Sequence, residues 1–300
     1  MAVGAGLSDL HRHLDGSLRK ATLEELAAHV GVSLPADIRF RAGMGLDGAL
    51  ACFRLTLSVL QTLEAVRRVA AEMCEDAAAD DVTTLEVRFA PQLHGQPIGD
   101  VIDAALDGIA GRAGLVLCAL YGEDPASVME LVETGGARRG VVGVDIAGGP
   151  APGHRWEMAS YAEAFRRAAE LGLGRTVHAG EGRPAAEIGV AIEVLGAQRI
   201  GHGTTLEDDP RVLDLVLERG VTIEACPTSN VHTGVIAAVE DHPLPRWLAR
   251  GVKACVNTDN TLFSDITAAE EHARARAIPG MTDALLARAI TCGHEAAFTR

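Results

Sequence analysis

The amino-acid sequence contains few aromatic residues and almost no lysine. Phe, Trp and Tyr together make up 3% of the 300 residues, which favours layered helices and strands rich in Ala, Val, Leu and Ile over an aromatic-rich β-sandwich. Lys20 and Lys253 are the only lysines, and 41 acidic against 27 basic residues give a formal net charge of −14. Because proteins bind the nucleic-acid backbone through clusters of Lys and Arg, this composition argues against nucleic-acid binding and favours a small or neutral ligand.

Several common sequence signatures are also missing. No uninterrupted apolar run approaches the ~18 residues of a membrane helix, and no basic segment with an apolar core and a cleavage site begins the chain, so we expect a cytoplasmic protein without a membrane partner. The six cysteines form no CxxC pair, which favours reduced, structural thiols. No GxGxxG motif opens a helix after a strand, and neither a phosphate-binding GxxxxGKS/T loop nor a GxSxG elbow occurs. The paired HxE and PCxxC motifs of cytidine-deaminase-type zinc sites are absent as well.

Eight short apolar or β-branched runs are separated by helical patterns. The runs cover residues 6–11, 83–89, 114–121, 140–146, 175–179, 199–203, 221–226 and 253–258. A strand followed by a helix, repeated eight times, predicts a (β/α)8 barrel of the TIM type. The long interval over residues 14–82 predicts extra helices inserted after the first strand, which often form a lid. No linker-like stretch divides the chain, so we expect a single domain over residues 1–300.

Side chains that can bind a metal follow several of these runs. A single histidine in a strand is more often a hydrogen-bonded core residue, but catalytic groups of this barrel type lie at the carboxyl ends of the strands. His11 and His13 end the first run and point to the same side of a strand because they are two residues apart. His178 and Asp259 end the fifth and eighth runs. Imidazole nitrogen and carboxylate oxygen suit zinc, so these four residues predict one metal site able to activate water.

Six motifs occur along the chain in the order HRHLDGSLR, VVGVDIAGG, VHAGE, RIGHGT, CPTSN and VNTDN. Together they resemble the adenosine deaminase family of metal-dependent barrel hydrolases, and the resemblance extends from about residue 7 to residue 298. It implies hydrolytic deamination of adenosine or 2′-deoxyadenosine to inosine or 2′-deoxyinosine with release of ammonia, and hence a place in purine metabolism. The partners that it implies are one zinc ion per chain, a purine nucleoside and water.

The resemblance also implies catalytic roles. Zinc would be held by His11, His13, His178 and Asp259, with a water as the remaining ligand. Glu181 would be the general acid at N1 of the purine ring. His202 and Asp259 would orient and deprotonate the water that adds to C6. A metal that lowers the pKa of water, a protonated carboxyl group and an imidazole beside the developing oxygen charge are each suited to this chemistry.

Substrate contacts are implied at His13, Asp15, Phe53, Gly148 and Asn260. Gly148 would offer its backbone N–H to purine N3, although a simple turn glycine explains it equally well. Asp15 would meet a sugar hydroxyl, which favours a nucleoside over free adenine; a helix cap is the alternative. Phe53 would cover the ribose, unless it only packs on a helix face. Asn260 replaces the more common Asp near N7 and can donate to that nitrogen at any pH.

Other interpretations of the same residues remain open. The same chemistry could act on adenine or on a 5′-modified adenosine such as aminodeoxyfutalosine. A non-catalytic purine-binding relative would have lost some of the catalytic positions, whereas the four ligands, Glu181 and His202 are all present. A two-metal barrel of the phosphotriesterase type would need a bridging lysine, and neither Lys20 nor Lys253 lies on the expected fourth or fifth strand.

Overall fold

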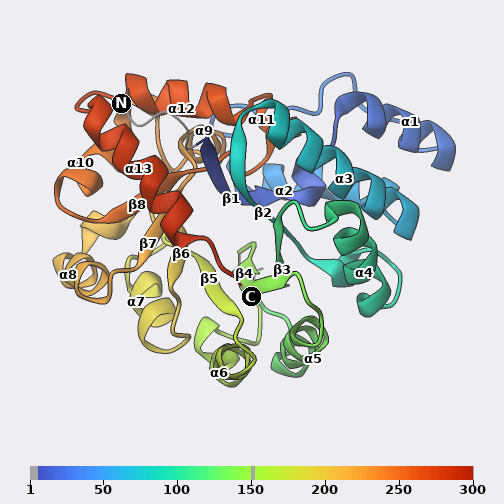
Figure 1. Ribbon diagram of the computed structural model, residues 1–300, viewed down its shortest axis with the longest axis horizontal. Helices are drawn as coiled ribbons and strands as arrows, with labels where there is room; N and C mark the ends of the chain where they lie inside the picture. Colours follow the sequence, from blue (N-terminus) through green and yellow to red (C-terminus); the bar gives the residue numbers. More distant parts are fainter. Residues whose placement is uncertain (1–5, 150–152, 300) are drawn as a thin grey trace.

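The computed structural model describes residues 6–149 and 153–299 of the chain. In this part of the chain, eight parallel strands follow one another in sequence order and form a barrel surrounded by helices (Figure 1). The strands are β1 (Leu7–His13), β2 (Val82–Phe89), β3 (Gly114–Leu120), β4 (Val141–Ala147), β5 (Gly174–Ala179), β6 (Arg199–His202), β7 (Thr222–Ala225) and β8 (Lys253–Val256). Each run that the sequence predicted as a strand is one, with its ends within two residues of the prediction. The TIM-type fold is therefore confirmed.

The barrel closes between β1 and the segment that follows β8. Arg12 and Asp259 form a parallel bridge. The N–H of Asp259 donates to the carbonyl of His11 over 2.8 Å, and the N–H of His13 donates to the carbonyl of Asp259 over 2.8 Å. The backbone hydrogen bonds that close the barrel thus hold three of the predicted metal ligands at a fixed spacing.

Helices cover the outside of the barrel because each has one apolar face. Those that follow strands in the alternating pattern are α3 (Leu63–Ala79), α4 (Ile98–Ile109), α5 (Pro125–Gly136), α6 (Ala162–Glu170), α7 (Ala186–Glu193), α8 (Pro210–Arg219), α10 (Leu244–Ala249) and α13 (Asp283–Ala296). In α8, the Asp209 side chain accepts from the backbone of Arg211, Pro210 is the first residue, and Gly220 ends the helix with φ of 63°. Val212 and Val216 of α8 are buried one turn apart.

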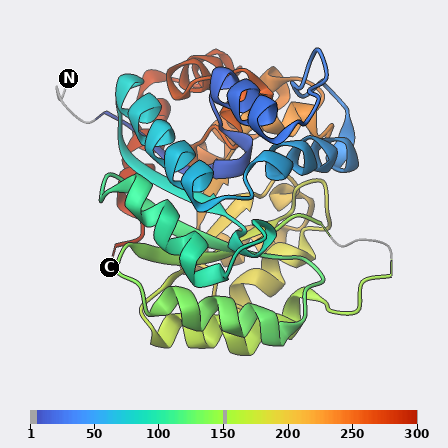
Figure 2. The same cartoon turned by 90° about the vertical axis from the view of Figure 1, so that its right-hand side faces the viewer.

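Further helices stand outside this alternating pattern. They are α1 (Lys20–Val30), α2 (Gly45–Val59), α9 (Pro227–His232), α11 (Thr261–Ser264) and α12 (Ala268–Ala277). The predicted insertion after the first strand is confirmed, since α1, α2 and α3 occupy it. Figure 2 shows α2 on one side of the barrel and the segment after α13 on the other. Phe53 of α2 contacts Phe263 of α11, with ring centroids 5.1 Å apart, so aromatic packing fixes the insertion to the barrel.

The strands bury apolar side chains on one face and polar or charged side chains on the other. Leu117, Val144, Val177 and Ile223 from neighbouring strands are buried in the main core. The six cysteines carry no disulfide, as the sequence predicted. Within the described residues no single helix is both apolar enough and long enough to span a membrane; one bent pair, Asp47–Val59 with Leu63–Ala79, passes on length and composition alone.

Candidate active site

The four predicted metal ligands converge at the carboxyl ends of the strands. His13 Nε2 lies 3.2 Å from His178 Nε2 and 3.5 Å from Asp259 Oδ1. His11 Nε2 lies 3.7 Å from the same Asp259 oxygen. The donor atoms of His11, His13 and His178 lie within 4.8 Å of one another, and so do those of His11, His202 and Asp259. Residues that are far apart in the sequence therefore surround one point.

The chemistry of this cluster fits a divalent metal ion. His11 Nε2 is buried and has no hydrogen-bond partner in residues 6–149 and 153–299, and such a group is costly to bury unless something binds it. Burial lowers the pKa of His11 and of His13 well below the ordinary value of 6.5, so both rings are neutral. Neutral imidazoles with their lone pairs directed at one point, next to a carboxylate, are the donor set of a zinc-type site.

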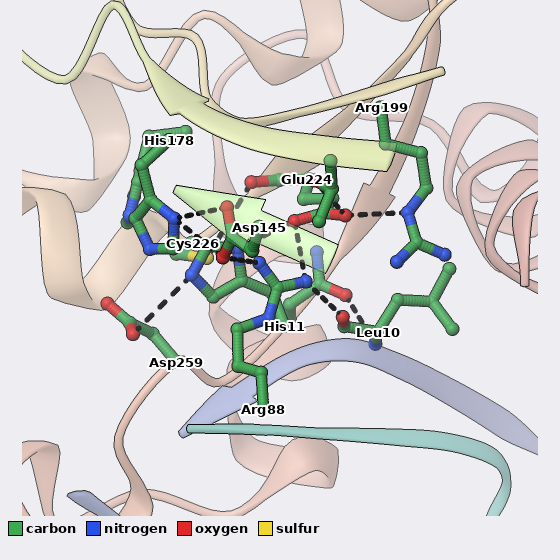
Figure 3. A network of polar contacts seen from close by, with 12 residues as sticks. Leu10, His11, Arg88, Asp145, His178, Arg199, Glu224, Cys226 and Asp259 are labelled. Carbon is green, nitrogen blue, oxygen red and sulfur yellow. Dashed lines mark hydrogen bonds and ion pairs between the residues drawn. The ribbon is translucent and has the colours of Figure 1, made fainter. Parts of the chain in front are cut away.

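Two buried carboxylates orient two of these histidines (Figure 3). His11 Nδ1 lies 2.8 Å from Glu224 Oε2, and His178 Nδ1 lies 2.9 Å from Asp145 Oδ2. Since Nδ1 donates its proton to a carboxylate, Nε2 keeps the lone pair that a metal needs. The arrangement directs Nε2 of both rings at the cluster.

Arg88 connects the two carboxylates. Its Nη1 donates to Asp145 over 2.9 Å and its Nη2 donates to Glu224 over 2.9 Å, while the same Nη2 donates to the carbonyl of Leu10 over 2.5 Å. All these side chains are fully buried, and Arg199 adds a second cation 2.7 Å from the other oxygen of Glu224. Buried charges of this kind are tolerated because each is paired with an opposite charge and hydrogen-bonded.

Sequence reasoning missed Arg88, Asp145 and Glu224. Each is a charged residue inside a predicted apolar strand, in the segments LEVRF, VGVDI and TIEAC. These charged residues could have been identified from the sequence, because a charge in a buried strand needs a partner or a function. Ser229, in the quoted motif CPTSN, was missed too, and its hydroxyl lies 2.5 Å from Asp259 Oδ2.

Glu181 and His202 face each other beside the predicted metal ligands. His202 Nε2 lies 3.7 Å from Glu181 Oε2. Burial raises the pKa of Glu181 above its ordinary value, an effect that His178 and Thr233 partly offset. Burial lowers the pKa of His202 to about 4. A carboxyl group with a raised pKa, which holds its proton more tightly, therefore lies next to a neutral imidazole.

The backbone is strained at two of the predicted catalytic residues. His202 has φ of 66° and Asp259 has φ of 61°, in the left-handed region that residues other than glycine seldom adopt. His202 is the last residue of β6, and Asp259 follows three residues after the end of β8. Such conformations cluster at functional sites, where the surrounding structure holds them in place.

A pocket of about 270 Å³ opens above the cluster. Every residue that the sequence predicted for the site lines it except His11, which lies beneath the pocket floor and is fully buried. The predicted residues in the lining are His13, Asp15, Phe53, Gly148, His178, Glu181, His202, Asp259 and Asn260. Leu50 and Leu57 of α2 form part of the apolar wall, and Arg54 of the same helix also borders the pocket.

The predicted substrate contacts differ in how the structure accounts for them. Asp15 does not cap α1, whose N-cap is Arg19; its Oδ1 is buried without a partner in the described residues, and burial raises its pKa to about 7. Gly148 has φ of 74°, so it is a turn glycine as well as a pocket residue. Phe53 both borders the pocket and packs against Phe263. Both explanations given for Gly148 and for Phe53 are thus compatible with their positions.

A parallel eight-stranded barrel with a histidine and aspartate cluster at the carboxyl ends of its strands defines a metal-dependent hydrolase. The sequence model of the adenosine deaminase family matches residues 7–300. The chain belongs to the adenosine deaminase family, as its motifs predicted, and it is an aminohydrolase of the class that acts on 6-aminopurines.

Similar proteins agree in fold and family. An adenosine deaminase of Erwinia tasmaniensis is 36% identical over 302 residues, covering 92% of this chain and 89% of that protein. An adenosine deaminase of Clostridium botulinum is 36% identical over 284 residues, covering 88% and 84%. Among solved structures, the adenine deaminase of Arthrobacter aurescens superposes with a TM-score of 0.89 at 25% identity, covering 99% of this chain and 95% of that one. A zinc-bound amidohydrolase of Burkholderia ambifaria has a TM-score of 0.88 at 25% identity, covering 98% and 86%.

Proposed function

We propose that this protein is a zinc-dependent deaminase that converts adenosine and 2′-deoxyadenosine to inosine and 2′-deoxyinosine with release of ammonia. The observation that carries the choice of a nucleoside is the buried, unpartnered Oδ1 of Asp15 in the pocket wall. A sugar hydroxyl can donate to this oxygen, whereas free adenine has no group there to do so.

His11, His13, His178 and Asp259 would hold the zinc ion. The orphaned Nε2 of His11 and the close approach of the two other Nε2 atoms support this assignment. When bound, the ion supplies a water that ionises near neutral pH. The carboxylates of Glu224 and Asp145 keep the imidazole lone pairs directed at it.

Proton transfers fall to Glu181 and Asp259. Asp259 takes one proton from the attacking water, whose oxygen forms a bond to C6, and Glu181 gives its proton to N1. In the second half, the Asp259 proton passes to the amino group, the C6–N bond breaks, ammonia leaves, and the hydroxyl proton at C6 returns to Glu181. The raised pKa of Glu181 suits a group that starts protonated.

Three further residues would recognise the purine nucleoside. The backbone N–H of Gly148 donates to N3, and the amide of Asn260 donates to N7. Asn260 Oδ1 is packed against Gly16, where an added Cβ would lie 1.8 Å from it, which leaves the amide nitrogen as the group able to reach a ligand. Phe53 covers the ribose from α2, 6.0 Å from the ring of His13, and His13 contacts the bound substrate from below.

One observation favours a second candidate substrate. Arg54 borders the pocket from α2 and is exposed. A cation at this position would suit an adenosine with an anionic group on the 5′ side of its sugar. The alternative function is therefore deamination of a 5′-modified adenosine by the same residues.

The test is turnover of adenosine, 2′-deoxyadenosine, adenine and adenosine 5′-monophosphate, followed by loss of the ultraviolet band of 6-aminopurines and by ammonia release. We expect turnover of the first two. Asp15→Ala should reduce kcat/KM for adenosine by about 10- to 100-fold, the worth of a hydrogen bond to a charged group. Preference for adenine would contradict the nucleoside assignment. Preference for the monophosphate that is lost in Arg54→Ala would establish the alternative.

A further inference from the structure

Three buried polar side chains run in a line away from the pocket behind His202. His202 Nδ1 lies 3.0 Å from Asn230 Nδ2 of α9, and Asn230 Oδ1 lies 3.3 Å from His242 Nε2. None of the three is more than 1% exposed. We call this line the His242 relay. The family motifs and the proposed function leave Asn230 and His242 without a role.

The direction of the relay is set by a backbone amide. The N–H of Leu244 donates to His242 Nδ1 over 3.1 Å. A backbone amide can only donate, so Nδ1 of His242 carries a lone pair and the proton of this neutral ring is on Nε2. Burial, together with the charges of His202 and Arg246, lowers the pKa of His242 to about 3, in agreement with a neutral ring.

The proton on His242 Nε2 fixes which atom donates in each of the two following hydrogen bonds. His242 Nε2–H donates to the carbonyl oxygen of Asn230, which fixes the orientation of the amide. The amide nitrogen of Asn230 then faces His202 Nδ1 and donates to it. Because Nδ1 of His202 accepts, its proton is on Nε2, the edge that faces Glu181 in the pocket.

Resting on the proposed function, we infer that His242 and Asn230 are positioning residues that hold His202 in the tautomer presenting Nε2–H to the pocket. His202 then donates a hydrogen bond to the oxygen that adds to C6, and it has no lone pair on that edge with which to take a proton from water. Deprotonation of the water therefore belongs to Asp259 alone. This resolves the joint role that the family resemblance gave to the two residues.

Packing alone explains the polar side chains of the relay less well than a positioning role does. His242 packs against Trp247, with ring centroids 5.4 Å apart, and Leu244 and Leu248 of the same helix as Trp247 are fully buried. An apolar side chain would fill this space without the cost of burying polar atoms. The polar line is instead complete from a backbone amide to the imidazole at the pocket.

The first test replaces the amide nitrogen of Asn230 by an oxygen, which reverses the direction of its hydrogen bond to His202. In Asn230→Asp the carboxylate cannot donate to His202 Nδ1 and accepts from it, which moves the ring proton to Nδ1. Nitrogen NMR of the 15N-histidine-labelled full-length enzyme, with and without zinc, distinguishes the two tautomers. We expect protonated Nε2 in the wild type and protonated Nδ1 in N230D. A lone pair on Nε2 of wild-type His202 would overturn the inference even in an active enzyme.

The second test uses two substitutions at His242. Glutamine can accept from Leu244 and donate to Asn230, as the histidine does, whereas phenylalanine can do neither. We expect His242→Phe and N230D to lower kcat for adenosine by about 10²-fold, the effect of losing one aligned donor to a developing oxyanion, with KM within about twofold. His242→Gln should recover most of this loss.

His272→Phe is the matched control. His272 is also buried, and it bonds through Nδ1 to the carbonyl of Ala268 in its own helix, away from the pocket. It should match H242F in lost thermal stability while keeping the wild-type kcat. Equal kcat in H242F and wild type would refute the positioning role. If the wild type deaminates none of the purines, the proposed function fails, but the NMR tautomer of His202 still decides whether the relay exists.

Discussion

Arg88 binds both carboxylates that orient the histidine ligands. Lysine in its place keeps the charge but lacks the planar fork that reaches two carboxylates at once. We expect Arg88→Lys to weaken zinc binding by about 10- to 100-fold, the usual effect of losing support for metal ligands. Competition with a coloured chelator measures the affinity without relying on activity.

Arg199→Lys provides the comparison for Arg88. Arg199 is equally buried and also pairs with Glu224, but through the other oxygen, and it pairs with Glu86. Its substitution should cost similar thermal stability and much less zinc affinity. Equal losses of affinity in the two variants would mean that general destabilisation, and not the link between the two carboxylates, controls metal binding.

Burial tunes the pKa of Glu181, the proposed general acid. Because its raised pKa keeps a proton available, Glu181→Gln should remove proton transfer to N1 while preserving shape. We expect kcat to fall by about 10²- to 10⁴-fold, with zinc affinity unchanged in the chelator assay. Glu193→Gln, an exposed residue at the end of α7, is the control and should be fully active. A variant of Glu181 that keeps most of its turnover would show that another group supplies the proton.

At the scale of elements, α2 forms part of the pocket wall. Phe53 borders the pocket, and its ring packs against Phe263, so α2 contributes apolar surface to the pocket wall. We expect Phe53→Ala to raise KM for adenosine about tenfold, because one lost aromatic contact is worth about 1–1.5 kcal/mol, and to leave kcat within about twofold. Leu55→Ala, on the same helix but away from the pocket lining, should leave both constants unchanged. Equal effects of the two substitutions would argue that α2 acts only through its folding.

The order of these elements could be read from the sequence, but the position of α2 could not. Apolar runs such as GLVLCALY and the helical patterns between them indicated every strand. The interval over residues 14–82 predicted helices, because it is too long for a loop. That α2 rather than α1 borders the pocket depends on Phe53 meeting Phe263, more than 200 positions later in the chain. No local pattern carries that contact.

At the scale of the whole molecule, Glu271 makes stability depend on pH. Glu271 of α12 is buried and accepts from both the backbone N–H and the hydroxyl of Thr228 at the start of α9. Burial raises its pKa from 4.5 to about 7. A carboxyl group whose pKa is higher in the folded state makes its full contribution to the stability of the fold below pH 4.5. This contribution is lost as the pH rises through about 7.

We therefore expect Glu271→Gln to be more stable than the wild type at pH 8, by on the order of 3 kcal/mol, and to match it near pH 4. Urea unfolding of the zinc-free proteins across this range measures the difference. Glu295→Gln, an exposed residue of α13, changes the net charge equally and should show no such trend. A constant difference between E271Q and wild type at all pH values would contradict the raised pKa.

The sequence by itself determined the eight strands and the family, and it predicted the four metal ligands, because these depend on local periodicity and on motifs such as HRHLDG and VNTDN. Only the tertiary structure decided how these residues are supported. Arg88 meets Asp145 and Glu224 across the barrel, and Asn230 meets residues 12 and 28 positions away. Such pairs arise only in the folded chain, since hydrogen bonds depend on distance in space and not on separation along the sequence.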